Sequence, residues 1–271
     1  MTRGVITLGI AAVCLALASG AALAETPSAA RANELAAQAV RDYDKAVSAS
    51  LTDSAAAAEL YRSSIAAMTT LAESGIRSPA LEYNLGNAYY RAGAMGRAVL
   101  HYRRAARLAP ADADIRANLE YVRHRVEPYL EPDQTAEALN DLAIWKRLPR
   151  ATQLMLVVAL GVIGWGLLAV RLRVRSTPLF VSGAVAVALA LIVVASLAAD
   201  LRSDRQRPEA VIVDGSQVLR RGRGDAYDPV INQALGPGVE LRILDERPDW
   251  MRVSLPTGET GWIAASSVAK V

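Results

Sequence analysis

The side chains that most often do chemistry in proteins are sparse in this chain. Its 271 residues include two histidines, His101 and His124, and one cysteine, Cys14. Each histidine falls alone on an expected helix, where a histidine is more typically solvated or hydrogen-bonded than a metal ligand or a base. The sequence contains no G-x-S-x-G, no H-E-x-x-H and no phosphate-binding P-loop. It therefore predicts a protein that is not an enzyme and holds no metal or other cofactor.

Residues 1–24 have the pattern of an export signal. Arg3 precedes an apolar run, and residues 22–24 (Ala-Leu-Ala) match the A-x-A cleavage pattern. The run is short and alanine-rich for a membrane span, although an uncleaved anchor is the alternative. Cys14 lies inside this segment, and Val13 before it does not fit a lipoprotein signal. After cleavage no cysteine would remain for disulfides, thiolate catalysis or zinc–sulfur sites.

The most specific pattern is a tetratricopeptide (TPR) repeat, PALEYNLGNAYYRAGAMGRAVLHYRRAARLAP, over residues 79–110. Such a repeat is two antiparallel helices that cross at small residues, here Gly86 and Ala98. Gly93 is expected to end the first helix and Pro110 the second. Since a TPR is a binding surface, this pattern favours an interaction protein over a catalyst.

The complete repeat, 79–112, belongs to a longer TPR-like helical region over residues 25–127. Residues 29–75 are expected to form a degenerate repeat that covers the apolar face of the good one, stretched by an alanine-rich insert at 48–58. Residues 112–126 are typical of a capping helix. A linker, 128–150, follows, and within it residues 135–148 are expected to lie near a membrane surface, with Trp145 as an interfacial anchor.

Four residues of the repeat are candidates for partner binding. Helix geometry places them on the side that faces the groove of TPR proteins, where an Asn and an Arg one turn apart can hold a backbone amide or a carboxylate. A carboxylate-clamp TPR would have a basic residue where the first of them stands. The alternative is that the tyrosines only pack against the preceding repeat. The candidates are Tyr83, Asn87, Tyr90 and Arg91.

Two charge-free runs, 151–170 and 176–199, are each about as long as the 20 residues that cross a bilayer. The joint between them, 171–175, is so short that the two helices must form a hairpin. Its arginines favour the cytoplasm, yet more arginines and lysines flank the hairpin at its other end. The export signal decides the orientation: the joint is inside and both flanking domains are outside. Small residues suited to helix packing are Gly161, Gly164, Gly166, Ser182, Ala186 and Ala190.

Beyond a short linker, 200–207, residues 208–271 have alternating apolar bursts separated by turn residues. Five short strands in about 60 residues are typical of a small SH3-like barrel. The bursts are 210–213, 218–219, 239–244, 250–255 and 261–264. Trp250 and Trp262 are expected in its core, or else beside a shallow groove. The basic run 220–224 is read as a solvated loop, with an anionic partner as the alternative.

This order of parts predicts a multidomain membrane protein: all-α TPR repeats, a two-helix transmembrane hairpin and a C-terminal all-β SH3-like barrel. Together with the motifs YNLGNAYYRAG, VLRRGRGDAYDPV and TGWI, it resembles the BatE-like proteins of bacterial aerotolerance (Bat) operons. The resemblance implies a multi-pass protein of the Gram-negative inner membrane with both terminal domains in the periplasm. Its implied partners are membrane-anchored von Willebrand A-domain proteins and a MoxR-type AAA ATPase, with no role for nucleic acid.

Three functions remain open from the sequence. The favoured one is a non-enzymatic scaffold that gathers partner proteins at the periplasmic face. The second is a membrane-anchored module that binds cell-wall peptides, because bacterial SH3-like domains often recognise peptidoglycan. The third, a sensor or an enzyme, lacks the nucleophile and ligand sets that it would need.

Overall fold

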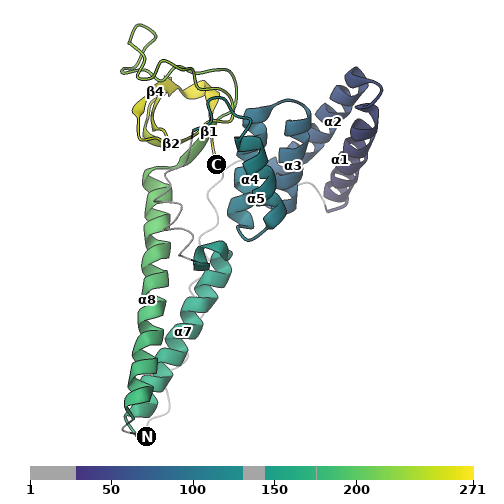
Figure 1. Cartoon of the computed structure of the whole chain (residues 1–271). Helices are drawn as coiled ribbons and strands as arrows, with labels where there is room; N and C mark the ends of the chain where they lie inside the picture. Colours follow the sequence, from purple (N-terminus) through teal and green to yellow (C-terminus); the bar gives the residue numbers. More distant parts are fainter. Residues whose placement is uncertain (1–28, 131–143, 175) are drawn as a thin grey trace, which may run out of the picture.

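The structure is a computed structural model, and it describes residues 29–130, 144–174 and 176–271 (Figure 1). These residues are mostly helical, with two long apolar helices and a small antiparallel sheet at the C-terminal end. The expected export signal lies outside the described residues, as does most of the expected interfacial segment. Of that segment, only a short 3-10 helix at Ile144–Arg147 and the residue after it are described.

The first five helices form a helical lobe, residues 29–130, in which two antiparallel pairs are followed by one further helix (Figure 1). Asp53 and Asp112 cap helices by accepting bonds from backbone N–H groups, as expected for Asp112. The alanine-rich segment expected as an insert is instead helical from Ser54 onward, because Asp53 starts the helix directly after a short turn. The helices are α1 (Ala29–Ala49), α2 (Ser54–Glu73), α3 (Pro79–Arg91), α4 (Met95–Leu108) and α5 (Ala113–Arg123).

Helices α3 and α4 contact each other closely at Gly86, as the sequence predicts. A Cβ atom there would lie only 2.7 Å from the ring of Tyr102, which is fully buried. His101, expected to be isolated, instead lies 2.7 Å from the carboxylate of Glu82 between the same two helices. The buried Glu82 therefore has a partner in His101, and the ring of His101 also stacks on Tyr89.

Helices α7 (Arg150–Arg171) and α8 (Thr177–Gln206) form an apolar hairpin. Both are long and apolar enough to cross a membrane, and only 11% and 22% of their apolar windows are buried inside the protein. They come closest where Gly164 meets Gly183; Gly161 and Gly166 have open space beside them. The expected linker at 200–207 is wrong, because α8 continues without a break to Gln206.

Residues 208–271 form a sheet lobe. Its five antiparallel strands lie in the order β4-β3-β2-β1-β5. The burst at 218–219 is not a strand and lies between Gln217 and Arg220, which form isolated bridges. The fifth strand, at Val268–Lys270, lies beyond the last predicted burst. Trp250 and Trp262 are half-buried and lie outside the apolar core, so their expected place in it is wrong. The strands are β1 (Glu209–Ile212), β2 (Glu240–Glu246), β3 (Trp250–Ser254), β4 (Thr260–Ala264) and β5 (Val268–Lys270).

Candidate functional site

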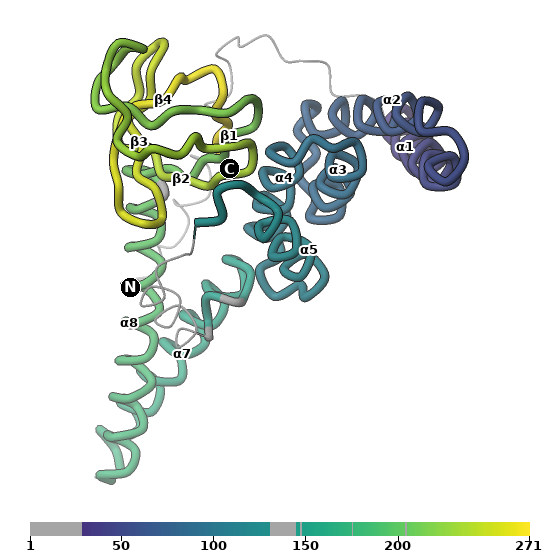
Figure 2. Tube along the Cα trace, turned by 45° about the horizontal axis from the view of Figure 1, so that its top comes forward, coloured from purple at the N-terminus to yellow at the C-terminus, as the bar shows by residue number. Residues whose placement is uncertain are grey.

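The helical lobe and the sheet lobe contact each other directly, with α4 and α5 beside β1 and β2 (Figure 2). A single cluster of buried apolar side chains runs from α1 through this contact into the sheet. Val99 and Val126 of the helical lobe both pack against Gly238 of the sheet lobe. The two regions that the sequence suggests as separate domains therefore share one core.

Three glycines allow this close approach. A Cβ atom on Gly96, at the start of α4, would lie 2.5 Å from the carbonyl oxygen of Ile212 in β1. Gly236 donates its N–H to the carbonyl of Glu127 at 2.9 Å, and a side chain there would strike that same carbonyl. Gly238 has a φ of +101°, and its missing side chain leaves room for Val126. Any larger residue at these positions would push the lobes apart.

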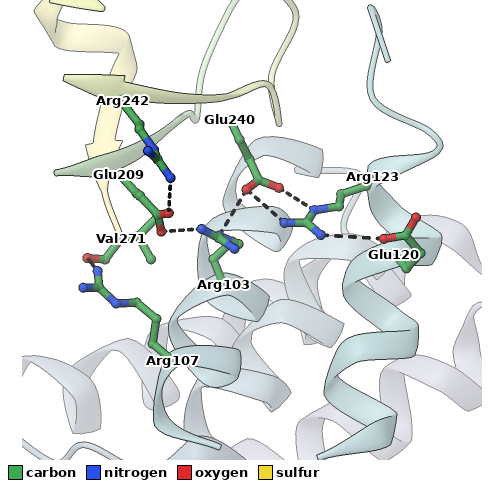
Figure 3. Close-up of polar contacts among 8 residues, drawn as sticks. All are labelled: Arg103, Arg107, Glu120, Arg123, Glu209, Glu240, Arg242 and Val271. Atoms are coloured by element: carbon green, nitrogen blue, oxygen red, sulfur yellow. Dashed lines mark hydrogen bonds and ion pairs between the residues drawn. The ribbon is translucent and has the colours of Figure 1, made fainter. Parts of the chain in front are cut away.

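We call the contact between the helical lobe and the sheet lobe the junction. Glu240, the first residue of β2, lies at its polar centre (Figure 3). Arg123 of α5 donates to both of its oxygens, at 2.6 and 3.1 Å. Arg103 of α4 lies between Glu240 and Glu209, and its Nη2 donates a hydrogen bond to the carboxylate of Glu209. At the rim, Glu120 lies 3.6 Å from Arg123. The pairs therefore connect two helices to two strands.

These charges are largely removed from solvent, since the side chains of Arg103, Arg123 and Glu240 are only 21%, 26% and 22% exposed. Burial acts to raise the pKa of Glu240, but the charge of Arg103 and the bonds from Arg123 outweigh it, so the pKa falls below its ordinary value. Burial acts to lower the pKa of Arg123, but the bonds and charges of Glu240 and Glu120 together outweigh it, so the pKa of Arg123 is raised. The set is therefore held in its charged form.

One contact in this network is ionic without being a hydrogen bond. Arg103 Nε lies 3.1 Å from a Glu240 oxygen. Its direction does not suit a hydrogen bond, and the buried Nε has no hydrogen-bond partner among the described residues. Arg103 is therefore less completely satisfied than Arg123.

Further bonds surround the junction. Arg97 pairs with Asp214 at 2.9 Å, which raises the pKa of Arg97. Arg104 and Arg107 donate to the backbone carbonyls of Lys270 and Val271. One face of α4 therefore supplies arginines along the length of β1 and β5.

The sequence-predicted groove residues Tyr83 and Asn87 are engaged inside the helical lobe. Tyr102 donates its hydroxyl to Asn87 Oδ1 at 2.6 Å, and Asn118 of α5 donates to the hydroxyl of Tyr83 at 2.7 Å. Burial raises the pKa of Tyr102, so its hydroxyl remains a donor. Asn87 therefore joins α3 to α4, and its carbonyl oxygen is already used.

Tyr90 is half-buried, as Tyr83 and Asn87 are, and only Arg91 of the four residues is exposed. The hydroxyl of Tyr90 donates to that of Tyr121 at 3.4 Å, which raises the pKa of Tyr90. Arg125 covers the ring of Tyr121, 3.6 Å from its centroid. Arg91 is exposed and forms no ion pair within the described part of the chain. Of the four predicted residues, Arg91 is exposed, whereas Tyr83, Asn87 and Tyr90 are half-buried and bonded to residues of other helices.

Within residues 29–130, 144–174 and 176–271, no cluster of three His, Cys, Asp or Glu side chains could hold a metal ion. His124 pairs with Glu120 of its own helix at 2.9 Å. Comparison with protein-family models, curated proteins and solved structures finds no match.

Proposed function

We propose that this protein is a non-catalytic scaffold of the bacterial inner membrane that presents its two lobes to partner proteins on the periplasmic side. The observation that carries the proposal is the junction at Glu240. Two lobes joined through one apolar core and a buried charge network form one rigid platform, whereas independent domains on flexible linkers would move separately. In finer terms, the helical lobe is a TPR-like region and the sheet lobe an SH3-like barrel.

The attachment of the lobes to the hairpin supports a membrane location. The helical lobe precedes α7, and only Arg207 and Pro208 separate α8 from β1. Two crossings return the chain to its starting side, so both lobes lie on one face of the bilayer. Cysteines introduced in place of Asn84 and Ser216, with Cys14 replaced, should react with an impermeant thiol reagent added to spheroplasts. Labelling only after the membrane is opened would contradict the periplasmic placement.

The resemblance to BatE-like proteins supplies the candidate partners. They are membrane-anchored von Willebrand A-domain proteins and, through them, a MoxR-type AAA ATPase complex. The surface that we assign to them is the part of the predicted groove at Tyr90 and the exposed Arg91. It combines an aromatic side chain with an exposed guanidinium, a combination enriched at binding hot spots.

The test is a crosslinking pulldown from membranes with the full chain. Arg91→Glu reverses the charge of an exposed groove residue, while Asn87 is avoided because its loss would break internal bonds. We expect Arg91→Glu to release partners that the intact chain captures, because reversing one buried interface charge costs several kcal/mol, on the order of 2–5. Arg77→Glu, an equally exposed arginine before α3, is the matched control and should capture the partners normally. Equal capture by both variants would contradict the assignment of the groove.

A second candidate function, binding of cell-wall peptides, has one observation in its favour. A hollow of about 400 Å³ on the sheet lobe is lined by Arg223, Tyr227, Arg247 and Trp250, among others. Arg223 also lies over the half-buried ring of Trp262, so aromatic and basic groups meet there. Since the lobes share a core, the intact chain in detergent should be pelleted with purified cell wall. Loss of pelleting in Trp250→Ala, but not in Arg252→Ala, would favour this function.

A further inference from the structure

A cavity of about 470 Å³ lies directly beside the Glu240 junction. Its walls come from three parts of the chain: the end of α5 and the residues after it, the end of α8, and the sheet lobe from β1 to the β3–β4 turn. Its volume lies in the range of about 300–1,000 Å³ that is typical of small-molecule sites. The partner-binding groove lies elsewhere, on the α3 and α5 side of the helical lobe.

The charges of the cavity do not balance. Four arginines and three glutamates line it, and the glutamates are mostly engaged by the buried arginines of the junction. Arg207, at the end of α8, forms no ion pair with any described residue. Arg242 has only a 3.9 Å contact to Glu209, which Arg103 already engages. The excess positive charge is therefore at the wall nearest α8. The full set is Arg103, Arg123, Arg207, Arg242, Glu120, Glu209 and Glu240.

The rest of the wall is largely apolar. Leu130 follows α5, Leu241 and Leu244 belong to β2, and Leu255 follows β3. Leu130 and Leu244 are only half-buried, so part of this surface stays available. An occupant that suits both halves carries a negative group at one end and an apolar body at the other.

The position of the cavity suggests the source of such an occupant. The charge-free run of α8 ends at Ala199, and Arg207 is eight residues further on, a rise of about 12 Å at 1.5 Å per residue. The headgroup layer on each side of a bilayer core is about 5–8 Å thick, given a core of about 30 Å within a total of about 40–45 Å. Arg207 and the cavity wall beside it therefore face the headgroup layer from about 4–7 Å outside it when α8 crosses the membrane.

We propose that this cavity binds the headgroup of an anionic phospholipid from the adjoining leaflet. The lipid phosphate pairs with Arg207 and Arg242, and the glycerol portion of the headgroup lies against Leu130 and Leu244. The inference rests on the proposed membrane location. A lipid held there contacts both lobes and the end of α8, so it ties the platform to the bilayer surface.

The experiment is native mass spectrometry of the full chain, purified in mild detergent and supplied with phosphatidylglycerol. We expect the intact chain to retain the lipid, and the pair Arg207→Glu with Arg242→Glu to retain at least tenfold less. The matched control is the pair Arg202→Glu with Arg252→Glu, which makes the same charge change at exposed positions of α8 and β3 that do not line the cavity. Leu244→Glu, which places a negative charge on the apolar wall, should also release the lipid.

Each alternative has its own readout. Equal retention by the two double variants would overturn the inference, as would equal retention of zwitterionic phosphatidylcholine by the intact chain. Displacement of the lipid by millimolar inorganic phosphate would contradict the proposal that the ligand is a lipid. It would indicate that the cavity binds a free anion instead. Carbonate extraction of membranes is measured alongside. A chain that is extracted contradicts the membrane location itself, whereas an integrated chain that retains no lipid contradicts only this inference.

Discussion

Glu240→Gln is the sharpest test of the junction, because it keeps the shape of the side chain and removes one charge. It leaves Arg103 and Arg123 about three-quarters buried without the carboxylate between them. Removing one partner of a fully buried ion pair costs about 3–5 kcal/mol. Here Arg103 keeps Glu209 and Arg123 keeps Glu120, and Glu240 is 22% exposed, so we expect about 2–3 kcal/mol.

Hydrogen exchange measures this loss where it occurs. The amide of Gly236 donates across the junction to Glu127, so it exchanges when the lobes separate. A loss of about 2–3 kcal/mol should speed its exchange roughly 30- to 140-fold, at 1.4 kcal/mol per factor of ten. The amide of Leu255, bonded within the β3–β4 hairpin, should be unaffected.

Glu246→Gln is the matched control, because it is the same substitution in the same strand. Glu246 pairs with Lys270 at the surface, where both side chains are 50% exposed, so its loss should cost no more than about 1 kcal/mol. If Glu240→Gln speeds exchange of the Gly236 amide no more than Glu246→Gln does, the buried charges do not hold the lobes together. The platform argument would then fail.

Three further outcomes are expected. Gly86→Ala should lower the stability of the helical lobe by about 1–3 kcal/mol, because its Cβ meets a buried ring of α4; thermal melting followed by circular dichroism should show this, with exposed Asn84→Ala unchanged. The folded pKa of Glu240 lies below the ordinary value of 4.5, so its stabilisation is full above pH 4.5 and is lost as the pH falls through the folded pKa. Protease susceptibility of the junction should rise over that acid range, and less so in Glu240→Gln; an equal rise in both would refute the pKa assignment. Gly164→Leu should disrupt hairpin packing in detergent while Gly161→Leu, beside open space, should not.

The local features of the fold could be predicted because their causes lie within a few residues. Gly93 has a φ of +77° just after α3, as the sequence indicates. Pro79 occupies the first position of α3 and Asp112 caps α5, which are places where Pro and Asp are typical. The charge-free runs likewise coincide with α7 and α8, because length and hydropathy alone decide whether a helix can span a bilayer. The continuation of α8 beyond the second run, to Gln206, was not predicted. The charged residues there are equally typical of a solvated helix and of a linker.

The candidate groove shows an intermediate case. Helix periodicity grouped Tyr83, Asn87, Tyr90 and Arg91 on one face of α3, since residues three and four apart share a face. It did not separate the exposed Arg91 from the three side chains that are bonded to other helices. That distinction depends on Tyr102 and Asn118, which lie on other helices.

The sequence by itself determined the helices of the repeat, the two apolar spans and the lack of familiar catalytic motifs, but not where every helix begins and ends. Only the tertiary structure decided that the lobes form one body, that β5 closes the sheet edge beside β1, and that a cavity lies at the end of α8. The physical reason is distance along the chain. Arg103 pairs with a glutamate 106 residues away and Arg123 with one 117 residues away. In the sequence each of these charges has the same signature as a solvated surface residue, and it becomes a buried partner only when the folded chain brings α4 and α5 against the sheet.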